Sequence, residues 1–242
     1  VVSQLLRPKK MKYKTNQFTW LGRVFGANQV MAVRADSGVK SLNELKSKQV
    51  IVASTGKGSP TFLVPQMMNG LLGTKFKIVT GYKGSKRTSM SVEQGETAGM
   101  SNSWVSWTKN RRDWFMDCGS KCFMIKLAQV GNTKEPDLPN LPLLTDLAKT
   151  ADDKAAAAML STAAVIGRGL AYPPGVSAKQ IKVMRTAFWN TVTSSKFTKD
   201  AKSKRLPVTP LKGAAIQKIV NGALKMSPEA VAKARAHIFP NK

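Results

Sequence analysis

The chain has 242 residues, 42% of them hydrophobic, which is typical of a folded protein with one large or two small domains and excludes a largely disordered chain. Lysine and arginine number 39 against 13 acidic residues, and the formal net charge of +26 attracts anions of every kind, including nucleic acid and acidic lipid. No apolar run approaches the roughly 18 residues that a membrane span needs, and no signal peptide is recognisable after Val1. We therefore expect the sequence to be a mature or truncated segment.

The first part of the chain alternates short β-branched runs with helices, an order that is typical of parallel β-α units. The clearest pair is the buried strand 49–53 and a helix that opens at Pro60, with Ser59 as its N-cap and Gly73 as its end. The other elements expected here are strands at 30–34, 75–80 and 97–100 and helices at 42–46 and 88–94.

Two glycine-rich loops follow strands in this region, residues 54–59 (Ser-Thr-Gly-Lys-Gly-Ser) and residues 81–85 (Gly-Tyr-Lys-Gly-Ser). Glycines let the backbone approach a ligand, and the unpaired N–H groups of a helix N-terminus favour an anion. Loops at the carboxyl ends of parallel strands are also where open sheets bind ligands. An ordinary strand-to-helix turn explains the first loop equally well. Its glycine spacing fits neither a Walker A loop nor the full dinucleotide fingerprint.

A third polar segment, Ser101 to Trp107, also follows a strand end and carries two tryptophans among small polar residues. These tryptophans either line a pocket wall or pack in the core, and for Trp107 we favour the core.

The second half of the chain is richer in helices. We expect a strand at 121–130, an extended loop at 137–142, helices near 143–150 and 152–160, a strand-like run at 162–170 and a stiff connector at 171–176. Ser177 caps a long helix, and two amphipathic helices, near 212–225 and 228–238, close the chain.

The residues needed for catalysis are scarce. His237 is the only histidine and is expected to be an ordinary surface residue, so a Ser-His or Cys-His nucleophile system is excluded. For Glu93 and Glu96 we favour a role at the end of a helix over general acid–base catalysis, and no cluster of carboxylates indicates a metal site. We expect no catalytic residue, no metal and no cofactor, and therefore a binding protein rather than an enzyme.

Cys118 and Cys122 are four residues apart and cannot complete a zinc site without a nearby histidine. A local disulfide and two free thiols both remain open. The basic clusters at 7–14 and 202–205 are short and lack the motifs of nucleic-acid-binding folds. We favour a uniformly basic, solvated surface over specific nucleic-acid binding, and keep a nucleic-acid-associated basic protein on an α/β scaffold as the alternative function.

Five runs, in register along nearly the whole chain, resemble the Bug family, the periplasmic solute-binding receptors of tripartite tricarboxylate transporters. Residues 52–59 (Val-Ala-Ser-Thr-Gly-Lys-Gly-Ser) are similar to the family's Ala-Ser-Ser/Thr-Gly-x-Gly-Ser loop, and residues 82–85 to its Tyr-Lys/Pro-Gly loop. The other three runs are Phe18 to Gly22, Asp137 to Pro142 and Ala171 to Val176.

The resemblance implies a type II periplasmic-binding-protein fold, in which two α/β lobes close on a ligand cleft like a Venus flytrap. It places residues 1–48 and 171–242 in lobe one and residues 49–170 in lobe two. In the family, main-chain N–H groups and small hydroxyls of the loops hold a ligand carboxylate. The residues of this chain that match, with two further candidates at the end, are Ser54, Thr55, Gly56, Gly58, Ser59, Tyr82, Lys83, Gly84, Ser103 and Trp104.

The implied function is a monomeric, periplasmic receptor that delivers a small carboxylate to membrane transporter subunits. Family members begin with a strand and an acidic Pro-Gly-Gly loop that this sequence lacks, so we expect it to be without its N-terminal segment. Basic residues around the two loops favour multiply charged anions. They are Lys57, Lys83, Lys86 and Arg87.

Overall fold

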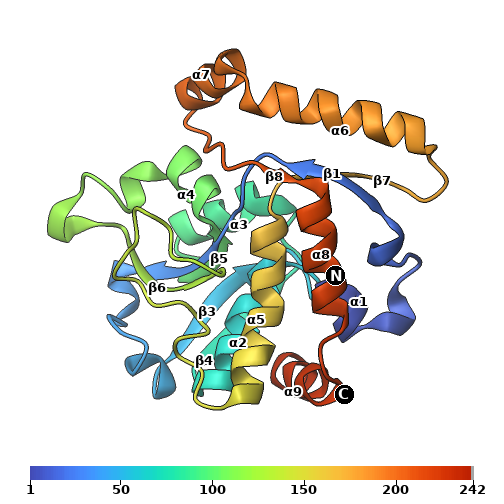
Figure 1. The fold of residues 1–242 in the computed structure, drawn as a ribbon. Helices are drawn as coiled ribbons and strands as arrows, with labels where there is room; N and C mark the ends of the chain where they lie inside the picture. Colours follow the sequence, from blue (N-terminus) through green and yellow to red (C-terminus); the bar gives the residue numbers. More distant parts are fainter. Residues whose placement is uncertain (241–242) are drawn as a thin grey trace. The chain divides into compact units, whose positions relative to one another are not determined.

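The computed structural model describes residues 1–240, which form two compact α/β units, each built around its own sheet (Figure 1). The first unit comprises Val1–Ala27 and Thr162–Ser227, and the second comprises Asn28–Ser161 and the chain from Pro228 onward. The expected α/β class is therefore confirmed. The expected lobes differ from these units at residues 28–48, 162–170 and 228–240. At 28–48 the reason is that β2 (Gln29–Arg34) pairs with β5 and β6 of the second unit.

The second unit holds a five-stranded mixed sheet in the order β4-β3-β5-β2-β6. β3 runs parallel to β4 and β5, whereas β2 is antiparallel to both of its neighbours. The parallel pairs confirm the expected β-α units. The remaining strands of the sheet span β3 (Gln49–Ser54), β4 (Lys75–Thr80), β5 (Gly99–Ser103) and β6 (Met124–Val130).

Helix α2 (Pro60–Leu72) begins and ends where the sequence predicts. Ser59 is its N-cap residue in an extended conformation, and Pro60 occupies the first position, where its missing N–H has no helical partner to lose. Gly73 ends the helix at φ 70°, in the left-handed region that favours glycine. The helix contacts four strands of the sheet, β2, β3, β4 and β5.

Helices α3 (Gly84–Glu93) and α4 (Trp104–Asn110) also pack against the sheet. Trp107 is fully buried, as favoured from the sequence, and its ring centroid lies 5.0 Å from that of Phe115 in an edge-to-face contact. Trp104, Trp114 and Met100 belong to the same buried cluster. This aromatic core fixes α4 and the carboxyl end of β5.

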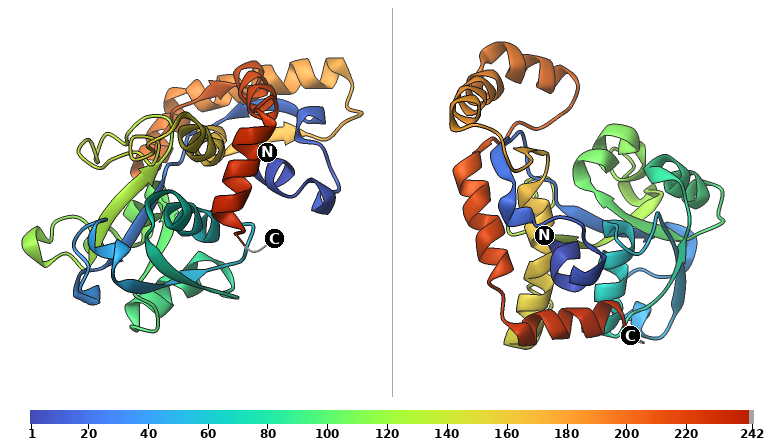
Figure 2. Two further views of the ribbon diagram at one scale, coloured as in Figure 1. Left: turned by 90° about the horizontal axis from the view of Figure 1, so that it is seen from below. Right: turned by 90° about the vertical axis from the view of Figure 1, so that its right-hand side faces the viewer.

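The C-terminal helix α9 (Pro228–Ile238) packs against α2 (Figures 1 and 2). Phe239, which follows α9, stacks on Phe62 of α2 with ring centroids 6.3 Å apart. The expectation that His237 is an ordinary surface residue is wrong, because its side chain is only 14% exposed and Nε2 lies 2.9 Å from Oδ1 of Asp153. The contact joins segments that are 84 residues apart.

The first unit holds a three-stranded sheet in the order β7-β1-β8, with both pairs antiparallel. Gly213, at the start of α8, has no room for a side chain, because a Cβ there would lie 1.9 Å from the backbone oxygen of Trp20. The elements of this unit are α1 (Val2–Leu6), β1 (Thr19–Arg23), β7 (Gly169–Tyr172), α6 (Ala178–Thr193), α7 (Ser195–Ser203), β8 (Leu211–Lys212) and α8 (Gly213–Leu224).

Three expectations for the second half differ from the structure. Residues 162–166 complete helix α5 (Ala151–Ile166), because this alanine-rich run is buried on several sides as a helix and ends at Gly167, φ 56°. Residues 143–150 form turns rather than a helix, since Leu143 bridges to Gln129 of β6. The strand expected from residue 121 begins only at Met124.

Cys118 and Cys122 form a disulfide with Cα atoms 4.9 Å apart, which settles the choice left open by the sequence. The bridge closes a short turn just before β6. No helix between residues 1 and 240 is long and apolar enough to cross a membrane.

Candidate functional site

Three of the segments identified in the sequence meet at one edge of the five-stranded sheet. Parallel strands end at the same edge, and β3, β4 and β5 end there at Ser54, Thr80 and Ser103. Ser54 pairs with Thr80 in the ladder, and one step beyond the pair the Tyr82 N–H donates to the Ser54 carbonyl at 3.3 Å. The two glycine loops therefore lie side by side.

The first loop is held by Thr61, a residue that the sequence analysis did not identify. Its Oγ1 accepts the Thr55 N–H at 3.0 Å and lies 3.1 Å from the Ser54 hydroxyl and close to the Ser59 hydroxyl. Thr61 is only 8% exposed, so this network is largely shielded from water. A threonine second in a helix, after an N-cap serine and a proline, is the local signal that could have identified it.

The network leaves several main-chain donors of the first loop unused. Between residues 1 and 240, the N–H groups of Lys57, Gly58 and Thr61 have no hydrogen-bond partner. Thr61 belongs to the first turn of α2. Gly56 adopts φ 152°, and a Cβ there would meet nothing within 4 Å. The loop thus presents donors at a helix N-terminus, where the helix dipole adds roughly 0.3–1 kcal/mol for an anion.

The second loop adds a matching set of donors from the N-terminus of α3. Lys83 precedes the helix without a side-chain cap, and the N–H groups of Ser85 and Lys86 are also unpaired in the described part of the chain. Tyr82 is half-buried, and its hydroxyl donates to Glu96 at 2.8 Å. Burial first, and then this carboxylate, raise the pKa of Tyr82. Tyr82 therefore remains neutral beside the loops.

Ser103 and Trp104 are placed at the same edge but point into the protein. Ser103 is 3% exposed and caps α4, with its hydroxyl accepting the Ser106 N–H at 3.3 Å. Trp104 is also 3% exposed, and its indole N–H donates to Asp137 at 3.2 Å. The buried Ser54 hydroxyl likewise bonds within the loop, accepting the Gly56 N–H at 3.1 Å. These side chains hold the edge in shape.

The charge around this edge is positive. Lys57, Lys83, Lys86 and Arg87 are all exposed beside the loops. Glu96, which bonds Tyr82, is the nearby carboxylate. Across residues 1–240, no group of three or more histidine, cysteine, aspartate or glutamate side chains could hold a metal ion. The edge is therefore built from hydrogen-bond donors and cations and suits an oxyanion.

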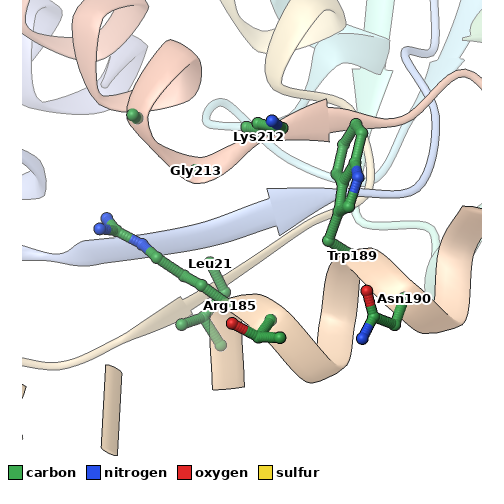
Figure 3. A pocket seen from close by; sticks show the side chains of 8 residues that line it. Leu21, Arg185, Trp189, Asn190, Lys212 and Gly213 are labelled. Carbon is green, nitrogen blue, oxygen red and sulfur yellow. The ribbon is translucent and has the colours of Figure 1, made fainter. Parts of the chain in front are cut away.

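A cavity of about 310 Å³ in the first unit has a different character (Figure 3). Arg185, in its wall, already donates through Nε and Nη2 to the Trp20 carbonyl at 3.0 and 2.9 Å. Lys212 lies over the Trp189 ring, with Nζ 5.0 Å from the centroid. Because both cations are engaged within the protein, this cavity is the weaker candidate for binding an anion.

Comparison with known proteins identifies the fold. No protein-family model and no curated protein sequence matches the chain. A TctC solute binding protein from Polaromonas is 17% identical with a TM-score of 0.65, over 98% of this chain and 75% of that one. Two further structures have the same TM-score at 15% identity.

The periplasmic binding protein BugD is 15% identical, with a TM-score of 0.65 over 96% of this chain and 74% of that one. MatC from Rhodopseudomonas palustris with bound malate is also 15% identical, with a TM-score of 0.65 over 98% of this chain and 75% of that one. The expectation drawn from the five sequence runs is confirmed at the level of the fold: this chain has the fold of the TctC and Bug solute-binding proteins.

Proposed function

We propose that this protein is an extracytoplasmic receptor that captures a small carboxylate at the shared edge of β3 and β4. One observation carries the proposal. The two glycine loops lie side by side and present unpaired main-chain N–H groups, in a fold that MatC uses to hold malate. Main-chain and hydroxyl donors bind an anion strongly without a permanent charge pair, so release to a transporter remains feasible.

The residues of the site divide between two tasks. Gly58 and Lys83 face the ligand with unpaired main-chain N–H groups. Gly56, Ser59 and Gly84, whose N–H groups are paired within the protein, shape the two loops, and Tyr82 forms a wall. Ser54 and Thr55 hold the first loop through Thr61, and Ser103 and Trp104 hold the start of α4.

The disulfide supports a location outside the cytoplasm. Bridges such as Cys118–Cys122 persist in oxidising compartments, of which the bacterial periplasm is one. There, the receptor works as a monomer without a cofactor, carries out no reaction and delivers its ligand to the membrane subunits of a tripartite tricarboxylate-type transporter.

A thermal-shift screen tests this function. The panel contains malate, a six-carbon dicarboxylate, citrate, glutamate and a short DNA duplex, each at about 50 and about 300 mM salt to separate site binding from screening of surface charge. A cognate carboxylate at about 100 times its dissociation constant should add roughly 2.7 kcal/mol of stability.

A shift with DNA alone that disappears at the higher salt concentration would replace this proposal with the nucleic-acid-associated alternative. If no carboxylate shifts the transition, the receptor function is wrong.

A further inference from the structure

The positive charge of the chain is divided unequally between its two units. The first unit, Val1–Ala27 and Thr162–Ser227, contains 18 of the 39 lysine and arginine residues, and Asp200 is its only acidic residue. The other 12 acidic residues belong to the second unit. Asp200 is itself engaged, because its carboxylate accepts the Lys204 ammonium at 2.9 Å. The charge that the sequence suggested to be uniform is thus concentrated in the first unit.

Helix α6 carries part of this charge and is packed on one side only. It contacts β1, and α7 adjoins its C-terminal end (Figures 1 and 2). Val192 is the one buried residue of the helix, and Phe188, one turn earlier on the same face, packs against Gly22 of β1. The opposite side of α6 therefore faces solvent.

This outward side of α6 combines an aliphatic side chain with lysines. Val183 is 60% exposed, more than any other large hydrophobic residue between 1 and 240, and its neighbour Met184 is 38% exposed. Lys179 lies one helical turn before Val183 on the same face, and Lys182 adjoins it. Both lysines are exposed, and neither forms an ion pair within the described chain. The helix thus presents apolar surface and positive charge together.

Helix α7 extends this cationic surface. Lys196 and Lys199 are exposed on it and likewise form no ion pair within residues 1–240. We define the α6–α7 surface as the exposed side chains of Lys179, Lys182, Val183, Met184, Lys196 and Lys199.

We propose that the α6–α7 surface binds the anionic headgroups of a phospholipid membrane, with Val183 at the boundary between headgroups and acyl chains. Helices that lie in this boundary combine lysines with exposed apolar side chains. Each lysine close to an anionic bilayer strengthens binding about fivefold, and its apolar stem tolerates contact with lipid. The two glycine loops belong to the second unit, so this contact is independent of the carboxylate that they bind.

Nucleic acid is the other polyanion that such a charge attracts. Proteins that bind single strands without sequence preference place exposed aromatic side chains beside their cations, because bases stack on them. On α6 the exposed apolar side chains are aliphatic. Phe188 and Trp189 are half-buried, and Lys212 covers the Trp189 ring with Nζ 5.0 Å from its centroid. The side chains of α6 therefore favour lipid.

Vesicle flotation tests the proposal with the whole chain. Vesicles of phosphatidylcholine alone are compared with vesicles that contain an equal share of phosphatidylglycerol, each at about 50 and about 300 mM salt. The protein should float with the anionic vesicles only, and more weakly at the higher salt concentration.

Two double variants form a matched pair. Lys179→Gln with Lys182→Gln and Lys75→Gln with Lys77→Gln each remove two exposed charges, but Lys75 and Lys77 lie on β4 of the second unit. The α6 variant should bind anionic vesicles on the order of twentyfold more weakly, whereas the β4 variant should bind like the unchanged protein.

A fluorescent label tests the contact of Val183 with lipid. Both cysteines of the chain are in the Cys118–Cys122 bridge, so Val183→Cys provides a single reactive thiol for a polarity-sensitive dye. Its emission should shift to shorter wavelength on anionic vesicles. The same dye on Val79→Cys, at a site 37% exposed in β4, is the control and should not shift.

Several results would overturn the proposal. They are equal flotation with both kinds of vesicle, equal losses in the two double variants, and vesicle binding without a shift of the label at position 183. Retention of a short DNA duplex through Lys179 and Lys182, without flotation, would assign the surface to nucleic acid instead.

Discussion

His237 Nε2 lies 2.9 Å from Asp153 Oδ1, so that the C-terminal helix α9 is bound to the first turn of α5. Lys233, one turn earlier in α9, brings its Nζ to 3.7 Å from the same oxygen. The hydrogen bond with His237 is the main cause that lowers the pKa of Asp153, and bonds from Thr150 and the charge of Lys233 add to it. The contact makes α9 an integral part of the second unit.

Asp153→Asn should lower the free energy of unfolding by about 1 kcal/mol at neutral pH, the net worth of one such hydrogen bond. Because the folded-state pKa of Asp153 is lowered, its contribution is present above the unfolded value of about 4 and is lost as the pH falls through the folded value. Thermal melts followed by circular dichroism between neutral and acidic pH measure this.

The exposed neighbour Asp152→Asn is the control, because it removes the same charge from the same helix turn. Equal melting curves for the two variants at neutral pH would show that the His237 contact contributes nothing.

Gly70→Ala should destabilise the protein, although alanine favours a helix. A Cβ at Gly70 would lie 2.5 Å from the Cβ and Nδ1 of His237 and 2.7 Å from its Cα, so α9 has to move. Overpacking of this kind costs roughly 1–3 kcal/mol, which exceeds the gain of up to about 1 kcal/mol in helix propensity. The matched control is Gly222→Ala in α8, where a Cβ meets nothing within 4 Å.

Gly222→Ala should therefore raise the stability while Gly70→Ala lowers it, as measured by urea unfolding of both variants. Stabilisation by both substitutions would contradict the packing of α9 on α2.

Thr61→Val should weaken carboxylate binding about tenfold and lower stability by roughly 1–3 kcal/mol, because it leaves the Thr55 N–H without its acceptor. Thr61→Ser keeps Oγ1 and should retain most of the affinity. Calorimetric titration with the best carboxylate from the screen measures both variants. If Thr61→Val binds as tightly as the unchanged protein, the network around Thr61 does not shape the site.

Glu135→Gln should raise the melting temperature at neutral pH. Burial is the main cause that raises the pKa of Glu135, so its contribution to stability is present below the unfolded value of about 4.3 and is lost as the pH rises through the folded value. Glutamine keeps an oxygen that accepts the Asn28 N–H, now at 3.2 Å, without the buried charge. The gain should disappear in acid.

Melting curves across this pH range measure the effect, with the exposed Asp113→Asn as the control. A gain for Glu135→Gln that persists unchanged in acid would show that the buried charge is not its source.

Reduction of the Cys118–Cys122 bridge should lower the free energy of unfolding by about 2 kcal/mol, the loop-entropy value for so short a ring. Urea unfolding with and without a phosphine reductant measures the change, and a Cys118→Ser, Cys122→Ser double variant should be insensitive to the reductant. Detection of two free thiols by a thiol-specific reagent in the untreated native protein would contradict the bridge.

Local signals determined much of this fold. Ser59, Pro60 and Gly73 mark the ends of α2, and Ser177 caps α6 with its hydroxyl accepting the Gln180 N–H. Each depends on hydrogen bonds between residues a few positions apart, so the sequence alone specifies them. The order of strand, glycine loop and helix likewise placed both loops at the carboxyl edge of a parallel sheet.

Long-range packing decided the rest. The sequence could not show that β2 lies between β5 and β6, that residues 162–166 continue a helix, or that His237 meets Asp153 across 84 residues. The role of Thr61 follows only from its neighbours in space. Helix caps and turns are encoded by adjacent residues, whereas strand order, burial and the contents of a cavity depend on which distant surfaces the folded chain brings together.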